Sequence, residues 1–225
     1  MILGQGVLQP IFLENLNFIQ VMNKGGLLMW PILICSVIAI SVFVERVIYY
    51  RRVDLDVGKF LSGIIPLIRK KAYAEALERC DESHGPVVRV CQAAILKREL
   101  ESSELRQVVK EIAQLQVPEI EARLSVLMSV GYIAPLLGLL GTVSGMIEVF
   151  FRLQSALSAA PVNDLTGGIW EALLTTAAGL SVAIPCYLGY NYLVSRMNVI
   201  LQDMERAGVE LIHAIVETRS KKEEA

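Results

Sequence analysis

Three long windows without any charged residue interrupt the pattern of hydrophobic and polar positions along the chain. They span residues 25–44, 124–147 and 172–195, which are 20, 24 and 24 residues long. A helix needs about 20 apolar residues to cross a bilayer, so each window predicts a transmembrane helix. The first window lacks a preceding basic stretch and is longer than the core of a signal peptide, so we expect it to remain as an anchor.

The remaining sequence is mostly helical in its pattern. Between residues 53 and 122, apolar positions recur three and four apart. From Ser102 an amphipathic pattern runs into the second window without a turn signal. We expect one long helix there, although Pro118 is a point where it can kink or break. The third helix is expected to continue to about Glu217.

The pattern therefore predicts an all-α membrane protein with three transmembrane helices. The second and third extend into the cytoplasm, where a small helical domain packs on them. The predicted segments are an outward-facing N-terminal segment (1–24), transmembrane helix 1 (25–50), a cytoplasmic helical domain (51–122), transmembrane helix 2 (123–151), an outward-facing loop (152–164), transmembrane helix 3 (165–195), and a cytoplasmic C-terminal helix and tail (196–225). The first segment is either a helix lying on the membrane surface or a loosely ordered leader.

Composition and charge support this topology. The 225 residues are 54% hydrophobic, with a mean hydropathy of +0.50 and a net charge of −2. The charge gives no signal for nucleic acid. Residues 51–110 hold twelve of the 21 basic residues, whereas the predicted outward loop holds only Arg152. The positive-inside rule then places the middle domain and the C-terminus in the cytoplasm, with the N-terminus outward.

The sequence shows no arrangement of residues that indicates an enzyme. It contains no phosphate-binding loop, no metalloprotease motif, no nucleophile elbow and no dinucleotide fingerprint. Cys80, His84 and Cys91 lack the number and spacing of structural zinc ligands. We therefore predict no catalytic residues, no metal and no cofactor.

Small residues recur at helical spacing in the second and third windows. Gly138, Gly141 and Gly145 are three and four residues apart, so they share one helix face. Such faces let two helix backbones approach closely, and tight packing is their simplest function. The third window carries a second small and partly polar face, formed by Ala172, Thr176, Gly179 and Ala183.

Polar side chains lie at matching depths in these two windows. Thr142 and Thr176 are each about eight residues from the outer end of their helix, or roughly 12 Å below the surface. Glu171 lies near the outer end of the third helix, and charges at membrane depth usually face a cavity or the protein interior. Several copies around a centre would make a polar ring. A lone threonine also bonds its own helix, which is the simpler interpretation of each hydroxyl.

The sequence resembles the MotA/TolQ/ExbB proton-channel family over nearly its whole length. The resemblance rests on "APLLGLLGTVSGM" and "GGIWEALLTTAAGLSVAIPCYLGYN" in the second and third windows. It extends to "FVERVIYYRR", "AYAEALERC" and "GPVVRVCQAAI". With three predicted spans in 225 residues, the sequence resembles the TolQ/ExbB branch of the family and not the four-span flagellar stators.

This resemblance implies a molecular motor in the inner membrane of a bacterium. Five copies would form a homopentamer, with a pore lined by the second and third helices. Two copies of a single-span TolR/ExbD-like partner would sit in that pore, and its intramembrane aspartate would carry the ion. The implied ion path includes Thr142 and Thr176, with Glu171 matching the family glutamate. Two further partners are implied. One is membrane lipid, and the other is a TonB/TolA-like protein that spans the periplasm.

Two alternatives stay open at this stage. Thr175 adds a hydroxyl where many proton-type relatives carry a small apolar residue, so a sodium-driven version of the same motor is the first. A non-energised membrane scaffold is the second, and it would need the glycines but neither the threonines nor Glu171. Glu148 either adds charge at the outer mouth or is a solvated residue beside Arg152. The resemblance does not choose between TonB-type import, Tol-type envelope maintenance, and gliding or secretion.

Overall fold

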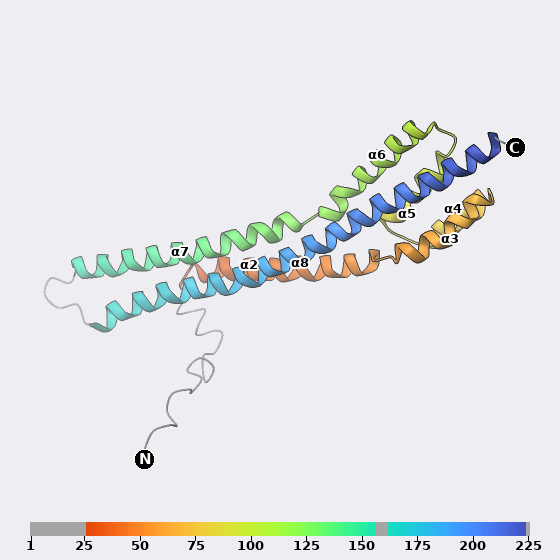
Figure 1. Cartoon of the computed structure of the whole chain (residues 1–225). Helices are drawn as coiled ribbons and strands as arrows, with labels where there is room; N and C mark the ends of the chain where they lie inside the picture. The colour runs from red at the N-terminus through yellow and green to blue at the C-terminus, as the bar shows by residue number, and fades with distance from the viewer. Residues whose placement is uncertain (1–25, 156–161, 224–225) are drawn as a thin grey trace, which may run out of the picture. The chain divides into compact units, whose positions relative to one another are not determined.

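The computed structural model describes residues 26–155 and 162–223. The predicted segment 1–24 and the middle of the predicted loop 152–164 lie outside the described residues. Within them every regular element is an α-helix and no β-strand occurs, which confirms the all-α fold class. The helices are α2 (Met29–Val53), α3 (Val57–Arg69), α4 (Tyr73–Asp81), α5 (Pro86–Leu96), α6 (Ser102–Glu121), α7 (Leu124–Ser155) and α8 (Val162–Glu223) (Figure 1).

The three predicted membrane spans are confirmed as helices. The helical stretches that contain α2, α7 and α8 are long and apolar enough to cross a membrane. Pro135 in α7 and Pro185 in α8 both lie inside continuous helices. α8 is a single helix of 62 residues that ends at Glu223, six residues beyond the expected end near Glu217.

The described residues divide into two compact units, and α2, α7 and α8 contribute to both. The first contains residues 26–40, 128–155 and 162–187, which include the larger part of each predicted membrane span. The surface of this unit is strongly apolar. Large side chains on it are more than half exposed, as expected for helices that face lipid or other membrane helices, among them Trp30, Ile34, Leu136, Leu173 and Ile184.

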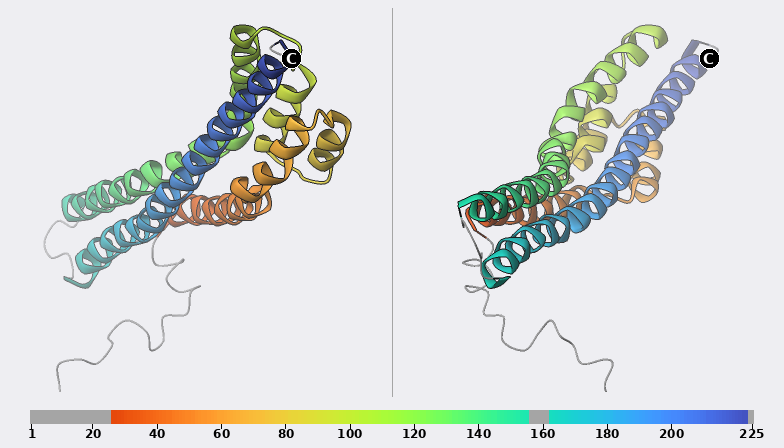
Figure 2. Two further views of the ribbon diagram at one scale, coloured as in Figure 1. Left: turned by 45° about the vertical axis from the view of Figure 1, so that its right-hand side comes forward. Right: turned by 90° about the vertical axis from the view of Figure 1, so that its left-hand side faces the viewer.

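The second unit contains residues 41–127 and the C-terminal part of α8 from residue 188. Here α4 packs against α3 and α5, and α5 packs against α6, beside the C-terminal part of α8 (Figure 2). Val90 of α5 and Val109 of α6 lie against Gly208 of α8. Fully buried aliphatic side chains from different helices form the core, and they include Leu61, Ile68, Ile95, Leu105 and Leu211. At the far end Arg69 of α3 forms an ion pair with Glu217 of α8 at 3.3 Å, and Arg219 donates hydrogen bonds to the carbonyl oxygens of residues 98–100.

α6 and α7 are separate helices, which corrects the expectation of one continuous helix from Ser102 through the second span. α6 continues past Pro118 to Glu121, and the chain then turns at Ala122 and Arg123. Arg123 has a φ of +64°, a left-handed conformation that ends the helix. The break therefore lies after Pro118, not at it.

Side chains of α2 stabilise this break. A helix that ends leaves its last carbonyl groups without intrahelical donors. Arg46 donates to the carbonyl oxygen of Glu119 at 3.1 Å, and the buried Tyr50 hydroxyl donates to that of Ile120 at 2.9 Å. The Arg123 guanidinium forms an ion pair with Glu45 at 2.6 Å. The start of α7 is thus held by the end of α2.

Candidate functional site

The small residues of the second and third spans face each other within one chain. Gly131 faces Cys186, Gly138 faces Thr176 and Gly145 faces Ala172, so α7 and α8 run antiparallel. Both faces predicted from the sequence contribute to this contact. Ala172 and Ala183 are buried with 3% and 7% of their surfaces exposed, and the glycines contact the opposite helix directly.

Backbone approaches backbone at this interface more closely than any side chain would allow. A Cβ atom on Gly179 would lie 2.5 Å from the carbonyl oxygen of Ala134 and 3.2 Å from the Cα of Gly138. A Cβ atom on Gly145 would lie 2.9 Å from the Cβ of Ala172. A Cβ atom on Gly141 would collide with the side chain of Thr175. The glycines are therefore needed for helix packing, the role that small-residue pairs serve in membranes.

Thr176 joins the two helices through its hydroxyl group. The Oγ1 atom donates to the carbonyl oxygen of Gly138 in α7 at 2.9 Å, and the carbonyl oxygen of Ala172 in its own helix lies 3.3 Å away as a second acceptor. Thr142 instead donates to the carbonyl oxygen of Leu139, one turn back in α7, at 2.7 Å. Both threonine side chains remain partly exposed.

Thr142 and Thr176 lie on the same flank of the α7–α8 pair. Thr142 directly follows Gly141 and Thr176 directly follows Thr175, and Gly141 and Thr175 meet at the interface. Each residue step turns a helix by about 100°. In two antiparallel right-handed helices, one step beyond the interface leads to the same side of the pair. We call this side the hydroxyl flank.

The two threonines are close in depth. The Thr176 hydroxyl is level with Gly138, and Thr142 lies four residues, or about 6 Å, further along α7. Exposed apolar side chains extend the hydroxyl flank around them, including Met146 of α7 with Leu173 and Leu180 of α8. A single chain thus presents two hydroxyls within an apolar surface that it does not cover itself.

Thr175 does not share this exposure. Only 2% of its surface is exposed, and its side chain fills the space over Gly141. Its hydroxyl donates to carbonyl oxygens of its own helix, those of Ala172 at 2.9 Å and Glu171 at 3.2 Å. The structure therefore places Thr175 inside the α7–α8 contact, where it serves packing.

Glu171 lies on the other side of α8 from Thr176. The five residue steps from Glu171 to Thr176 turn the helix by about 500°, which leaves the two side chains roughly 140° apart. The Glu171 carboxylate lies against Gly26, in the space that a side chain at position 26 would occupy, just before α2 begins. The structure brings Thr142 and Thr176 together but does not bring Glu171 to the same flank. Glu148 forms an ion pair with Arg152 at 2.5 Å, and both side chains are about half exposed.

Sequence reasoning missed the residues that position the start of α7. Arg46 and Tyr50 are four residues apart and so lie on one face of α2. An arginine inside the end of an apolar helix is a signal that a specific partner compensates its charge. The partners here are Glu45 and the terminal carbonyl groups of α6.

Three membrane-length helices, with two of them packed through glycines and exposing paired hydroxyls, define a membrane protein built for assembly with other helices. Residues 82–206 match the model of the MotA/TolQ/ExbB proton channel family. The chain is 34% identical to biopolymer transport protein exbB1 of Vibrio cholerae over 176 residues, which are 76% of each chain. It is 26% identical to the putative biopolymer transport protein ExbB-like 3 of Synechocystis sp. over 193 residues, 84% of this chain and 91% of that one.

A shorter match is to a protein that is named for the Tol-Pal system. It is 40% identical to the Tol-Pal system protein TolQ of Haemophilus influenzae over 88 residues, 39% of this chain and 38% of that protein. The chain belongs to the MotA/TolQ/ExbB proton channel family, in its TolQ/ExbB branch. This membership makes it part of an ion-driven, energy-transducing membrane complex.

Proposed function

We propose that this protein is the pore-forming subunit of an inner-membrane motor that couples the proton motive force to mechanical work. The hydroxyl flank carries the proposal, because Thr142 and Thr176 stand together on a surface that one chain leaves open. Hydroxyl groups at this depth can hydrogen-bond a chain of water molecules or a carboxylate of another helix. A packing interface alone would need the glycines but not this exposed pair.

The proposed assembly is a homopentamer around two copies of a single-span partner of the TolR/ExbD type. The names of the relatives, which refer to biopolymer transport and to the Tol-Pal system, support this class of complex. The hydroxyl flanks of the five subunits would face the lumen. The partner's intramembrane aspartate would meet the threonines there, and a TonB/TolA-like protein would carry the work across the periplasm.

The energetics suit a proton as the coupling ion. A carboxylate that enters apolar surroundings has its pKa raised, so the partner aspartate becomes neutral and can turn past the apolar part of the hydroxyl flank. One elementary charge that crosses 100 mV releases about 2.3 kcal/mol. The burial of Thr175 supports the proton over sodium, because its hydroxyl is turned into the α7–α8 contact and leaves fewer oxygen ligands on the hydroxyl flank.

The test is to remove each hydroxyl without changing its volume. We expect Thr142→Val and Thr176→Val to abolish motor function in a complementation assay with the partner present. Thr142 is the cleaner site, because its hydroxyl bonds only its own helix and its loss leaves the α7–α8 contact intact. Ser181→Ala is the matched control, since this exposed hydroxyl of α8 also bonds its own helix, to Ala177 at 2.7 Å, and lies away from the hydroxyl flank.

Native mass spectrometry of the detergent-extracted complexes separates lost function from lost assembly. Wild type and all three variants should contain five copies of the chain with two of the partner. Full activity in both Thr→Val variants would overturn the ion path and leave the scaffold as the better explanation. A wild-type complex with any other copy number would overturn the proposed pentamer.

A further inference from the structure

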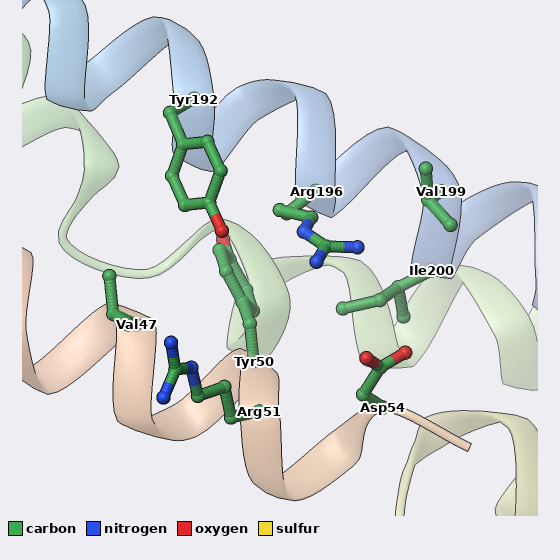
Figure 3. A pocket seen from close by; sticks show the side chains of 8 residues that line it. All are labelled: Val47, Tyr50, Arg51, Asp54, Tyr192, Arg196, Val199 and Ile200. Carbon is green, nitrogen blue, oxygen red and sulfur yellow. The ribbon is translucent and has the colours of Figure 1, made fainter.

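A basic cleft lies between the C-terminal end of α2 and the middle of α8, within the second unit. It has a volume of about 30 Å³ and is lined by Arg51, Arg196, Tyr192 and Asp54, together with Tyr50 and apolar side chains. Figure 3 shows Arg51 on α2 and Arg196 on α8, with Tyr50 between them and Tyr192 beside Arg196 on α8. The cleft is far smaller than the roughly 300–1,000 Å³ of a typical cofactor or drug-sized site. Only a compact group fits at its mouth.

The cleft lies where both helices leave the membrane. Arg196 is the first charged residue after the charge-free window 172–195, and Arg51 lies in the last turn of α2, seven residues after the end of the charge-free window 25–44. The ring of Phe43 lies 2.9 Å from the position of a Cβ atom on Gly189, which fixes the register of the two parallel helices. The same register places Tyr50 beside Arg196, so the two arginines stand at one depth. Both helices thus carry their arginine at the same membrane surface.

The protein compensates the charge of the two arginines only in part, through the nearby carboxylate of Asp54. Both side chains are exposed, and among the described residues no carboxylate forms an ion pair with Arg51 or Arg196. The Arg196 guanidinium lies 6.0 Å from the centre of the Tyr192 ring, which holds it over the cleft. One carboxylate, Asp54, faces the two guanidinium groups, so the cleft keeps a net positive charge.

An exposed apolar strip leads from the arginines into the membrane. On α2, Val44 lies seven residues before Arg51 and so on nearly the same face, and 49% of its surface is exposed. On α8, Leu188, Tyr192 and Arg196 are spaced four apart, and Leu188 is 65% exposed. A molecule with a negatively charged group and an attached hydrocarbon chain would match this arrangement, with its charge at the arginines and its chain along the apolar strip.

We propose that the cleft binds the phosphodiester group of an anionic glycerophospholipid, whose acyl chain lies along the strip formed by Val44, Ile48 and Leu188. Basic clefts between membrane helices at this level recognise anionic headgroups. Guanidinium groups donate paired hydrogen bonds to phosphate oxygens, so either arginine at the cleft offers donors to the phosphodiester. The lipid would bridge α2 and α8 just beside Tyr50, which also holds the end of α6.

The test uses the full-length protein purified in detergent with its oligomer intact. Native mass spectrometry would measure retention of dioctanoyl phosphatidylglycerol, dioctanoyl phosphatidylcholine and inorganic phosphate. We expect phosphatidylglycerol to bind most tightly. The double variant Arg51→Gln/Arg196→Gln should weaken its binding about thirtyfold, since each arginine near the surface contributes a factor of about five. Arg52→Gln is the matched control, because this arginine is adjacent and exposed but does not line the cleft.

Several results would overturn the proposal. Equal binding of phosphatidylglycerol and phosphatidylcholine by the wild type would show that the cleft does not distinguish an anionic headgroup from a zwitterionic one. Equal losses in Arg52→Gln and the double variant would mean general surface attraction. Displacement by equimolar inorganic phosphate would mean a free-anion site. Asp54→Asn should tighten phosphatidylglycerol binding, and weaker binding would indicate that Asp54 holds a headgroup amine. If the double variant fails to assemble, two other results test the proposal: the preference of the wild type for phosphatidylglycerol over phosphatidylcholine, and the loss of phosphatidylglycerol binding in the single variant Arg196→Gln.

Discussion

Gly179→Ala tests whether backbone contact between α7 and α8 sets the position of the threonines. The new Cβ atom would stand 2.5 Å from the carbonyl oxygen of Ala134, about 0.9 Å short of the 3.4 Å at which ordinary contact begins. The Cα of Gly138 is also within 3.2 Å. Because both neighbours are backbone atoms, no side chain can rotate away. The helices must separate by several tenths of an ångström.

The expected cost follows from two opposing effects. Overpacking of a tight contact costs about 1–3 kcal/mol. Alanine stabilises the helix by about 0.5–1 kcal/mol relative to glycine, because glycine loses more backbone conformational entropy when the helix forms. The net loss is about 1–2 kcal/mol, which lowers the thermal midpoint of a protein of this size by about 2–8 °C. Separation would also lengthen the hydrogen bond from Thr176 to the Gly138 carbonyl group.

The shift in thermal midpoint would be measured by heating the detergent-purified protein and monitoring the folded fraction by size-exclusion chromatography. Gly167→Ala is the matched control, since a Cβ atom there meets nothing within 4 Å. It should leave the midpoint unchanged or raise it by up to about 4 °C through helix propensity alone. Equal midpoints for Gly179→Ala and Gly167→Ala would refute the reasoning that this interface is limited by backbone contact.

Two further predictions concern buried groups. Burial raises the pKa of Cys80 to about 11 and of Cys91 to about 12, so iodoacetamide at pH 8 should leave both thiols unlabelled until urea unfolds the protein; prompt labelling of the folded chain would contradict their burial. Because the folded pKa values are raised, the stability that these thiols contribute is complete below pH 9 and is lost as pH rises through 11 and 12. Thr175→Val should retain motor function at fixed membrane potential with or without sodium, since its hydroxyl is buried in packing; a sodium requirement in wild type that this variant removes would contradict the proton assignment.

The sequence predicts the spans well but not the break before the second span. Long windows without charge leave few alternatives to membrane helices, whereas residues 119–124 contain neither glycine nor a turn motif. The left-handed turn at Arg123 is stabilised by contacts from α2, whose side chains are 70 or more residues away along the chain. Tertiary contacts of this kind are invisible to local periodicity. The extension of α8 to Glu223 was missed because its last turns are polar.

The candidate site shows the same division. Spacing alone predicts that the glycines share a face, and the structure places that face against α8. Spacing does not tell which of the adjacent Thr175 and Thr176 points away from α7, because a shift of one residue turns the side chain by about 100°. That choice depends on the fit of Thr175 over Gly141, a contact between residues far apart in the chain.

Glu171 shows how the geometry refines the idea of a polar ring. A lumen that is lined by the hydroxyl flank meets Thr142 and Thr176 directly, whereas the Glu171 carboxylate stands on the side of α2 beside Gly26. Five residues of helix separate Glu171 from Thr176 by about 7.5 Å of rise, so the two groups are on the order of 10 Å apart. At an effective dielectric constant of about 20, a unit charge at that distance attracts a cation by about 1.7 kcal/mol. Glu171 can therefore favour a cation on the outer part of the path through space, while the hydrogen bonds to that cation or to its water come from the threonines.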